Sequence, residues 1–176
     1  MTSSSRIILV TGGARSGKSA LAERLAGQFD MPRIYIATAT AGDKEMRERI
    51  ARHREIRGSE WRTVEESLDL AGALTRTDGQ GVRLVDCLTL WLSNSFRDDD
   101  FAAETGPLCA TLAAQKSPVV LVINELGLGI VPENALARRF RDAHGLMNQA
   151  VAATADQVWM SVSGLPLRLK PERGTP

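Results

Sequence analysis

A glycine-rich segment near the start of the chain carries the residue types that bind phosphate. The residues Gly12, Gly13, Ala14, Arg15, Ser16, Gly17, Lys18 and Ser19 match the pattern G-x-x-x-x-G-K-[ST] at every fixed position. Glycines let the backbone N–H groups of such a loop turn toward phosphate oxygens, and the N-terminus of the following helix adds unpaired donors. We expect Lys18 to reach the β- and γ-phosphates of a nucleoside triphosphate, and Ser19 to ligate Mg²⁺ through its hydroxyl.

The elements expected around this segment are those that the motif requires. Residues 6–11 (RIILVT) are apolar and β-branched, which predicts a buried parallel strand, and residues 18–26 are expected to form a helix. The alternative is a glycine-rich connection that binds nothing, but motif and context agree against it. The prediction is therefore a triphosphate-binding loop at residues 12–19, with a reaction that the loop alone does not name.

Two acidic residues follow later strands of the expected sheet. Asp86 ends the strand at residues 82–86 and suits the magnesium-binding acid of a phosphate-loop enzyme, with a strand-end cap as the alternative. Glu125 follows the strand at residues 118–124 and faces the crevice outside the carboxyl ends of the strands. Contact with substrate or metal and capping of the next loop are equally open for Glu125.

One histidine has two interpretations. His53 shares a helical face with Met46, Ile50 and Arg57, by their spacing in a helix expected at residues 44–57. Most histidines in such positions serve packing or the surface. A neutral imidazole is also a nucleophile, and its attack on the α-phosphorus of a triphosphate would release pyrophosphate and leave a nucleotidyl-histidine. The other histidine, His144, is assigned a structural role.

Strands and helices alternate along the chain, which predicts an α/β fold with a mainly parallel sheet and helices on both faces. Thr63 and Glu66 form a possible capping box for a helix at residues 64–76, and Gly27 is placed to end the first helix in a left-handed conformation. Strands are expected at residues 6–11, 33–37, 82–86, 118–124 and 157–163, further helices at 88–96, 106–115 and 133–155, and a short edge strand or hairpin at 165–170.

Composition limits the remaining possibilities. The 176 residues favour one domain over residues 1–176, with a core at about 6–170 and a loose tail at 171–176. The net charge of +1 gives no electrostatic case for nucleic acid or a membrane surface as a partner. Cys87 and Cys109 lack metal-ligand spacing and are expected to be reduced. With no signal peptide and no integral membrane segment in the sequence, a cytoplasmic protein is expected.

Longer motifs resemble one family. The segment TGGARSGKS is followed in order by YIATA, DKEMRERIARHR, EWRTVEE, LVDCLTLWLSN and VINELGLGIVPENALARRFRDAHGLMNQAVAATADQVWMSVSG. This order resembles the bifunctional adenosylcobinamide kinase/adenosylcobinamide-phosphate guanylyltransferases of cobalamin biosynthesis, from about residue 6 to residue 170. The stretch with the pattern VxNExGxGIVPEN is highly specific, since generic phosphate-loop kinases do not carry it.

The resemblance implies a RecA-like P-loop fold, a homo-oligomer that is often a trimer, and two reactions. ATP or GTP phosphorylates the aminopropanol hydroxyl of adenosylcobinamide. GTP then guanylylates a histidine, which corresponds to His53 here, and the GMP passes to adenosylcobinamide phosphate. The corrinoid is thus the expected small-molecule partner, and Mg²⁺ the expected cofactor.

The resemblance also implies further site residues. Nucleotide contacts correspond to Ala37, Thr38, Ala39, Arg54, Glu55, Ile56, Arg57, Glu65 and Asp86, with Glu65 expected at the start of a helix. The chain departs from some members at Arg52, where they have a second histidine, and at Asp86, where they have glutamate.

Three other functions compete with this one. A kinase-only enzyme would act on another small metabolite or nucleotide. A GTP-binding switch is disfavoured because the sequence lacks the N-K-x-D motif that reads guanine. A non-catalytic, ATP-driven assembly subunit is disfavoured mildly by the near-neutral charge.

Overall fold

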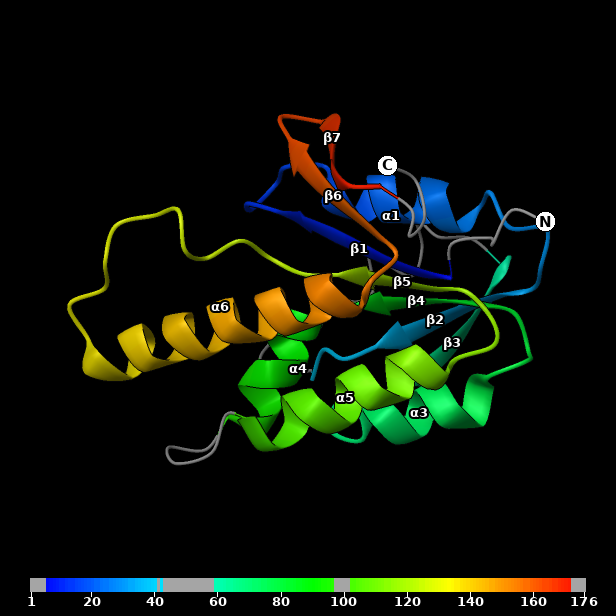
Figure 1. Ribbon diagram of the computed structural model, residues 1–176, viewed down its shortest axis with the longest axis horizontal. Helices are drawn as coiled ribbons and strands as arrows, with labels where there is room; N and C mark the ends of the chain where they lie inside the picture. The colour runs from blue at the N-terminus through cyan, green and yellow to red at the C-terminus, as the bar shows by residue number, and fades with distance from the viewer. Residues whose placement is uncertain (1–5, 41, 43–58, 97–101, 172–176) are drawn as a thin grey trace.

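The computed structural model describes residues 6–40, 42, 59–96 and 102–171. Its centre is a seven-stranded sheet in the order β3-β2-β4-β5-β1-β6-β7 (Figure 1). The strands are β1 (Ile7–Gly12), β2 (Arg33–Ala37), β3 (Trp61–Glu65), β4 (Val82–Asp86), β5 (Val119–Val122), β6 (Gln157–Val162) and β7 (Leu165–Lys170). Strands β1 to β6 are parallel and β7 is antiparallel to β6, so the mainly parallel sheet with a C-terminal hairpin is confirmed.

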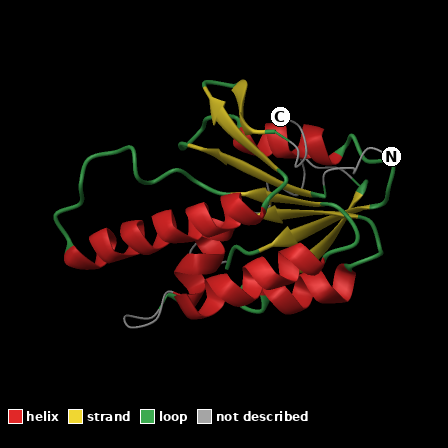
Figure 2. Ribbon diagram, in the orientation of Figure 1, coloured by secondary structure: helices red, strands yellow, loops and turns green. Residues whose placement is uncertain are grey.

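Helices cover both faces of the sheet (Figure 2). They are α1 (Lys18–Ala26), α3 (Leu70–Thr77), α4 (Leu88–Ser95), α5 (Ala102–Ala114) and α6 (Ala135–Thr154). Alternate residues of each strand supply the two cores, because successive side chains point to opposite faces. Ile8 and Val10 pack with α1 on one face, whereas Ile7 and Leu9 pack with α3, α4, α5 and α6 on the other.

The region after β2 differs from the expected capping box. Thr63 lies inside strand β3, which pairs in parallel with β2, and the helix begins only at Leu70. Asp69 is the actual N-cap, and its carboxylate accepts a hydrogen bond from the N–H of Gly72. Glu66 instead accepts hydrogen bonds from the N–H groups of Leu68 and Asp69. Pairing with β2 overrides the local helix signal, because the residues WRTV suit a pleated sheet surface.

Three helix ends also differ from the sequence predictions. Gly27 keeps the right-handed conformation, with a φ of −65°, and its N–H donates to the carbonyl of Glu23. Helix α5 begins four residues before the expected 106, and its interior includes Pro107. Burial of Leu108 and Leu112 in the core holds α5 together despite that proline. Helix α6 begins at Ala135, after its N-cap Asn134. The helix expected at 44–57 lies outside the described residues.

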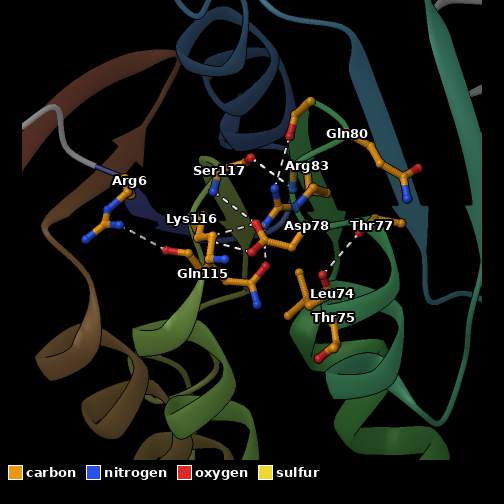
Figure 3. Close-up of polar contacts among 12 residues, drawn as sticks. Arg6, Leu74, Thr75, Thr77, Asp78, Gln80, Arg83, Gln115, Lys116 and Ser117 are labelled. Atoms are coloured by element: carbon orange, nitrogen blue, oxygen red, sulfur yellow. Dashed lines mark hydrogen bonds and ion pairs between the residues drawn. The ribbon is translucent and has the colours of Figure 1, made fainter.

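A buried charged residue, Arg83, forms a hydrogen-bond network at the end of the sheet where the parallel strands begin (Figure 3). Arg83 of β4 is fully buried, and its guanidinium donates to the carboxylate of Asp78 over 3.2 Å and to the side-chain oxygen of Gln115. The Asp78 carboxylate also accepts from the N–H groups of Lys116 and Ser117. This network connects the turn before β4 with the loop before β5. It lies at the N-terminal ends of the strands, whereas the phosphate loop lies at their C-terminal ends.

Candidate active site

The strand register aligns several predicted site residues in one row across the sheet. Parallel pairing places Glu65 beside Ala37, Ala37 beside Asp86, and Asp86 beside Val122 of β5, which pairs with Val10 of β1. The phosphate loop begins directly after this row. The structure therefore places Asp86 at the same C-terminal end of the strands as the loop, on a strand two positions from β1.

Backbone conformation explains why glycine occupies two positions of the phosphate loop. Gly12 has a φ of +154° and Gly17 a φ of +93°. A Cβ atom on Gly12 would lie 2.5 Å from Ser16 Oγ and 2.6 Å from the carbonyl oxygen of Ser161. Real Cβ atoms do not approach other atoms so closely, so only glycine fits there. Gly13 has nothing within 4 Å of its Cβ position, so its outer side is open.

The loop rests against the turn between β6 and β7. The carbonyl oxygen of Ser16 accepts two hydrogen bonds, one from Ser161 Oγ at 2.7 Å and one from the N–H of Gly164 at 2.8 Å. A Cβ on Gly17 would lie 3.2 Å from Gly164 Cα. Sequence reasoning did not select Ser161 and Gly164, since they lie about 145 residues beyond the loop and the quoted motif that contains them gives no sign of this contact.

Three residues of the loop carry polar side chains that could serve phosphate binding, namely Ser16, Lys18 and Ser19. Lys18 Nζ donates to the carbonyl of Gly13 over 3.0 Å, which places the ammonium over the loop. Ser16 Oγ is buried and finds no hydrogen-bond partner among the described residues. Ser19 is half-buried on the first turn of α1. A bound anion would satisfy such a loop, because its amides and the lysine all favour negative charge.

Thr38 makes hydrogen bonds to other residues inside the protein. Its side chain is fully buried, and its hydroxyl accepts from the N–H of Cys87 and donates to the carbonyl of Cys87, each over 2.8 Å. Its backbone N–H donates to the carbonyl of Asp86, and its own carbonyl accepts from Asn94 Nδ2. A nucleotide contact at residues 37–39 stays a prediction, but the polar groups of Thr38 are already engaged.

Asp86 is held by a residue that sequence reasoning did not select. The Tyr35 hydroxyl donates to Asp86 Oδ2 over 2.7 Å. Burial, followed by the negative charge of Asp86, raises the pKa of the adjacent Cys87 thiol to about 11, while the positive charge of Lys18 lowers it. Cys87 is therefore a protonated thiol at neutral pH. It is buried, and Cys109 is likewise free.

The donor set fits Mg²⁺. Carboxylate and hydroxyl oxygens such as those of Asp86 and Ser19 are hard ligands, and Mg²⁺ usually takes one or two protein ligands together with water and substrate phosphates. Within the described ranges no group of three or more histidine, cysteine or acidic side chains is placed to hold a metal.

Glu125 serves the loop that follows it. Its N–H donates to the carbonyl of Gly12, and its carboxylate accepts from the N–H of Gly127 over 2.6 Å, which supports the loop-cap interpretation. The nearby His144 is buried and bonds to Thr89 Oγ1 over 2.9 Å. Burial lowers the pKa of His144, and the charge of Glu125 partly opposes that shift. The structural assignment of His144 agrees with these contacts.

The other predicted residues lie apart from the phosphate loop or outside the described residues. Glu65 ends strand β3 rather than starting a helix, so its expected position was wrong. It lies four strands from β1, which is about 19 Å at the ordinary strand spacing. Glu65 is therefore not part of the phosphate loop's surroundings, and its contact with a nucleotide stays a prediction. His53 and residues 54–57 are outside the described part of the chain.

Comparison with known protein families shows which family this chain belongs to. The model of the family described as cobinamide kinase / cobinamide phosphate guanyltransferase matches residues 8–169. The chain belongs to this family. One similar relative is the bifunctional adenosylcobalamin biosynthesis protein CobP of Pseudomonas aeruginosa. It is 48% identical to this chain of the cobinamide kinase family, over 93% of this chain and 97% of its own length. CobU of Salmonella typhimurium is 43% identical over 93% of this chain and 99% of its own length.

Solved structures show the same fold at low identity. The flagellar accessory protein FlaH of Methanocaldococcus jannaschii has a TM-score of 0.55 and 13% identity, and covers 95% of this chain and 79% of its own. The RadB recombinase has a TM-score of 0.51 and 16% identity, and covers 89% and 74%. The cobinamide kinase family chain thus has the RecA-like P-loop fold. Among the helices that the structure describes, none has both the length and the apolar character to cross a bilayer.

Proposed function

We propose that this chain is a bifunctional enzyme that phosphorylates adenosylcobinamide with ATP or GTP and then converts adenosylcobinamide phosphate to adenosylcobinamide-GDP. The observation that carries the proposal is the phosphate loop of residues 12–19 at the same end of the sheet as Asp86, in a chain that matches the family model over residues 8–169. The relatives CobP and CobU are both named as bifunctional proteins of adenosylcobalamin biosynthesis, which supports two activities in one chain.

The kinase step needs positioning and charge neutralisation more than covalent chemistry. The loop amides hold the triphosphate, and Lys18 exchanges its contact with the Gly13 carbonyl for the β- and γ-phosphate oxygens. Ser19 and Asp86 are the residues that would hold Mg²⁺, which supplies charge neutralisation between the phosphates when bound. Asp86 and Glu125 remain the candidates for the base that accepts the proton of the substrate hydroxyl.

The guanylyl-transfer step passes through His53. An imidazole nitrogen forms a bond to the α-phosphorus of GTP, and the bond to pyrophosphate breaks. A phosphate oxygen of adenosylcobinamide phosphate then attacks the same phosphorus, and the bond to His53 breaks. The product is adenosylcobinamide-GDP with a regenerated histidine. Residues 54–57 and Glu65 are proposed to contact the nucleotide, as the family resemblance implies.

Labelling with α-³²P-GTP and Mg²⁺ tests the covalent step. We expect a labelled protein whose label is acid-labile and base-stable, as for a phosphoramidate. His53→Ala should not label but should keep kinase activity with γ-labelled triphosphate, whereas Lys18→Ala should lose triphosphate binding or turnover. His144→Gln is the matched control, because the chain has two histidines, and it should label normally.

Two outcomes would contradict the proposal. Equal labelling of His53→Ala would exclude this residue as the nucleophile. Transfer of the γ-phosphate with no covalent GMP in the unmodified protein would instead indicate a kinase-only enzyme.

We also propose that the chain forms a homo-oligomer, with a trimer as the arrangement that the family resemblance implies. Edge strand β7 supports this, because Leu165, Leu167 and Leu169 are all more than half exposed and an apolar edge strand favours pairing with another chain. Light scattering measures the mass in solution, and a monomeric mass would contradict the proposal. A cytoplasmic location remains a prediction.

A further inference from the structure

Tyr35 lies in β2, the strand next to β4, and its side chain reaches Asp86 at the end of β4. Parallel pairing of β2 with β4 places Tyr35 beside Leu84, and Ala37 beside Asp86. Tyr35 and Asp86 therefore point to the same face of the sheet, since residues two apart share a face. The Tyr35 side chain is buried, and its hydroxyl extends along the strand to Asp86 Oδ2 at 2.7 Å.

This hydrogen bond fixes one carboxylate oxygen and leaves the other. A phenol remains protonated at neutral pH, so it donates and the carboxylate accepts. Within the part of the chain that the structure describes, Asp86 Oδ1 has no hydrogen-bond partner, so it is available to a metal ion or to a metal-bound water. A bond to a charged acceptor is stronger than one between neutral groups, and it restricts the rotation of the carboxylate.

The partners of Tyr35 and Asp86 hold this geometry from both sides. The ring of Trp61 in β3 meets the Tyr35 ring edge-on, with centroids 6.1 Å apart and an interplanar angle of 89°. Thr38, also in the segment ending β2, bonds the N–H and the carbonyl of Cys87, and so fixes the backbone directly after Asp86. Neighbouring residues of one chain segment thus secure both the side chain and the backbone of the acid.

We propose that Tyr35 is a positioning residue for the magnesium site, which orients the Asp86 carboxylate toward the metal of a bound Mg²⁺–nucleotide. The proposal rests on the metal-binding role assigned to Asp86 under the proposed function. Groups that orient a metal-binding carboxylate contribute strongly to metal affinity, although they do not touch the ion. Tyr35 therefore acts on the metal through Asp86, not on the nucleotide itself.

Tyr35→Phe is the decisive variant, because it removes the hydroxyl and keeps the ring against Trp61. The measurement is equilibrium binding of a fluorescent, non-hydrolysable GTP analogue, first in EDTA and then titrated with MgCl₂. We expect the Mg²⁺ concentration at half-maximal enhancement to rise about 10-fold. Binding in EDTA should stay at the wild-type value, and so should the melting temperature within a few degrees.

A double-mutant cycle with Asp86→Asn separates this inference from the proposed function. If Asp86→Asn leaves the Mg²⁺ midpoint unchanged, the metal assignment of Asp86 fails, and the proposal for Tyr35 fails with it. If Asp86→Asn shifts the midpoint and Tyr35→Phe does not, only the role of Tyr35 is overturned. In the Asp86→Asn background, Tyr35→Phe should add no further shift. A Tyr35→Phe protein that weakens binding equally in EDTA, or that unfolds, would show a structural hydroxyl and would also overturn the proposal.

Discussion

The backbone N–H of Gly164 donates a hydrogen bond of 2.8 Å to the carbonyl oxygen of Ser16. Ser161 Oγ donates to the same oxygen, so the turn between β6 and β7 holds the phosphate loop at its centre. A carbonyl directed toward this turn cannot point into the space where a phosphate would bind. The hairpin therefore helps to set the direction of the loop amides that the anion requires.

This contact predicts an unequal effect of two similar glycine substitutions. Gly164 and Gly79 have φ angles of +81° and +78°, and neither has an atom within 4 Å of its Cβ position. Alanine at either site should lower the free energy of unfolding by about 1 kcal/mol, because an L-residue is strained there. Only Gly164→Ala should weaken nucleotide binding, because Gly79 lies at the N-terminal ends of the strands, away from the phosphate loop. Thermal unfolding and nucleotide titration of both variants check this, and equal affinities would refute a link between the hairpin and the loop.

Removal of Asp78 should destabilise the protein without changing the site. The variant Asp78→Ala leaves the fully buried Arg83 guanidinium without its carboxylate partner, which should cost about 3 kcal/mol of unfolding free energy. Burial alone would raise the pKa of Asp78, but the N–H groups of Ser117 and Lys116 and the charge of Arg83 outweigh it and lower that pKa below 3.8.

The matched control is Asp69→Ala, which removes an exposed helix cap and should cost about 1 kcal/mol. Urea unfolding measures both losses. Nucleotide affinity, measured below the transition, should be unchanged in both variants. A loss of affinity in Asp78→Ala would contradict the separation of the two sheet edges.

His144 should make the protein less stable in mild acid. Burial lowers its pKa below the ordinary 6.5, so the folded protein keeps the ring neutral while the unfolded chain takes up a proton. The stability that this provides is complete above about pH 6.5 and is lost as the pH falls toward the folded pKa. The free energy of unfolding should therefore fall more steeply between pH 7 and pH 5 in the wild type than in His144→Gln. Parallel curves for the two proteins would disprove this contribution.

Cys87 should produce the opposite effect in alkali. Its pKa of about 11 exceeds the ordinary 9.0, so the unfolded chain ionises first as the pH rises. The corresponding stability is present below pH 9 and is lost by about pH 11, a change of up to roughly 2 to 3 kcal/mol. Unfolding of wild type and Cys87→Ala between pH 8 and pH 10.5 measures the difference. An equal loss in both proteins would show that the buried thiol makes no such contribution.

The sequence carried local signals for some of these features and none for others. The phosphate loop and the alternating strands were predictable, because motif and periodicity are local properties. Strand β3 was not, since its state depends on pairing with β2, and the Thr63–Glu66 pattern imitates a helix start. The internal role of Thr38 depends on contact with Cys87, 49 residues further along the chain. The support of Ser16 by Ser161 joins residues 145 apart, which no local pattern reveals.

The buried position of Arg83 illustrates a different limit. A charged residue within a short apolar strand is consistent with an edge position, yet β4 lies between β2 and β5 and Arg83 is fully buried. Its burial depends on Asp78 and Gln115, which come from a turn and a helix end. The sequence shows each of these residues but not their convergence.

The hairpin contact also orders events during synthesis on the ribosome. The phosphate loop leaves the ribosome first, and Ser161 and Gly164, which support it, follow about 145 residues later. At about 5 to 20 residues per second this delay is roughly 7 to 30 s. During that interval the nascent chain has the nucleotide-binding motif without the turn that orients Ser16. We therefore expect the loop to bind a triphosphate tightly only after the turn between β6 and β7 has been synthesised and has folded.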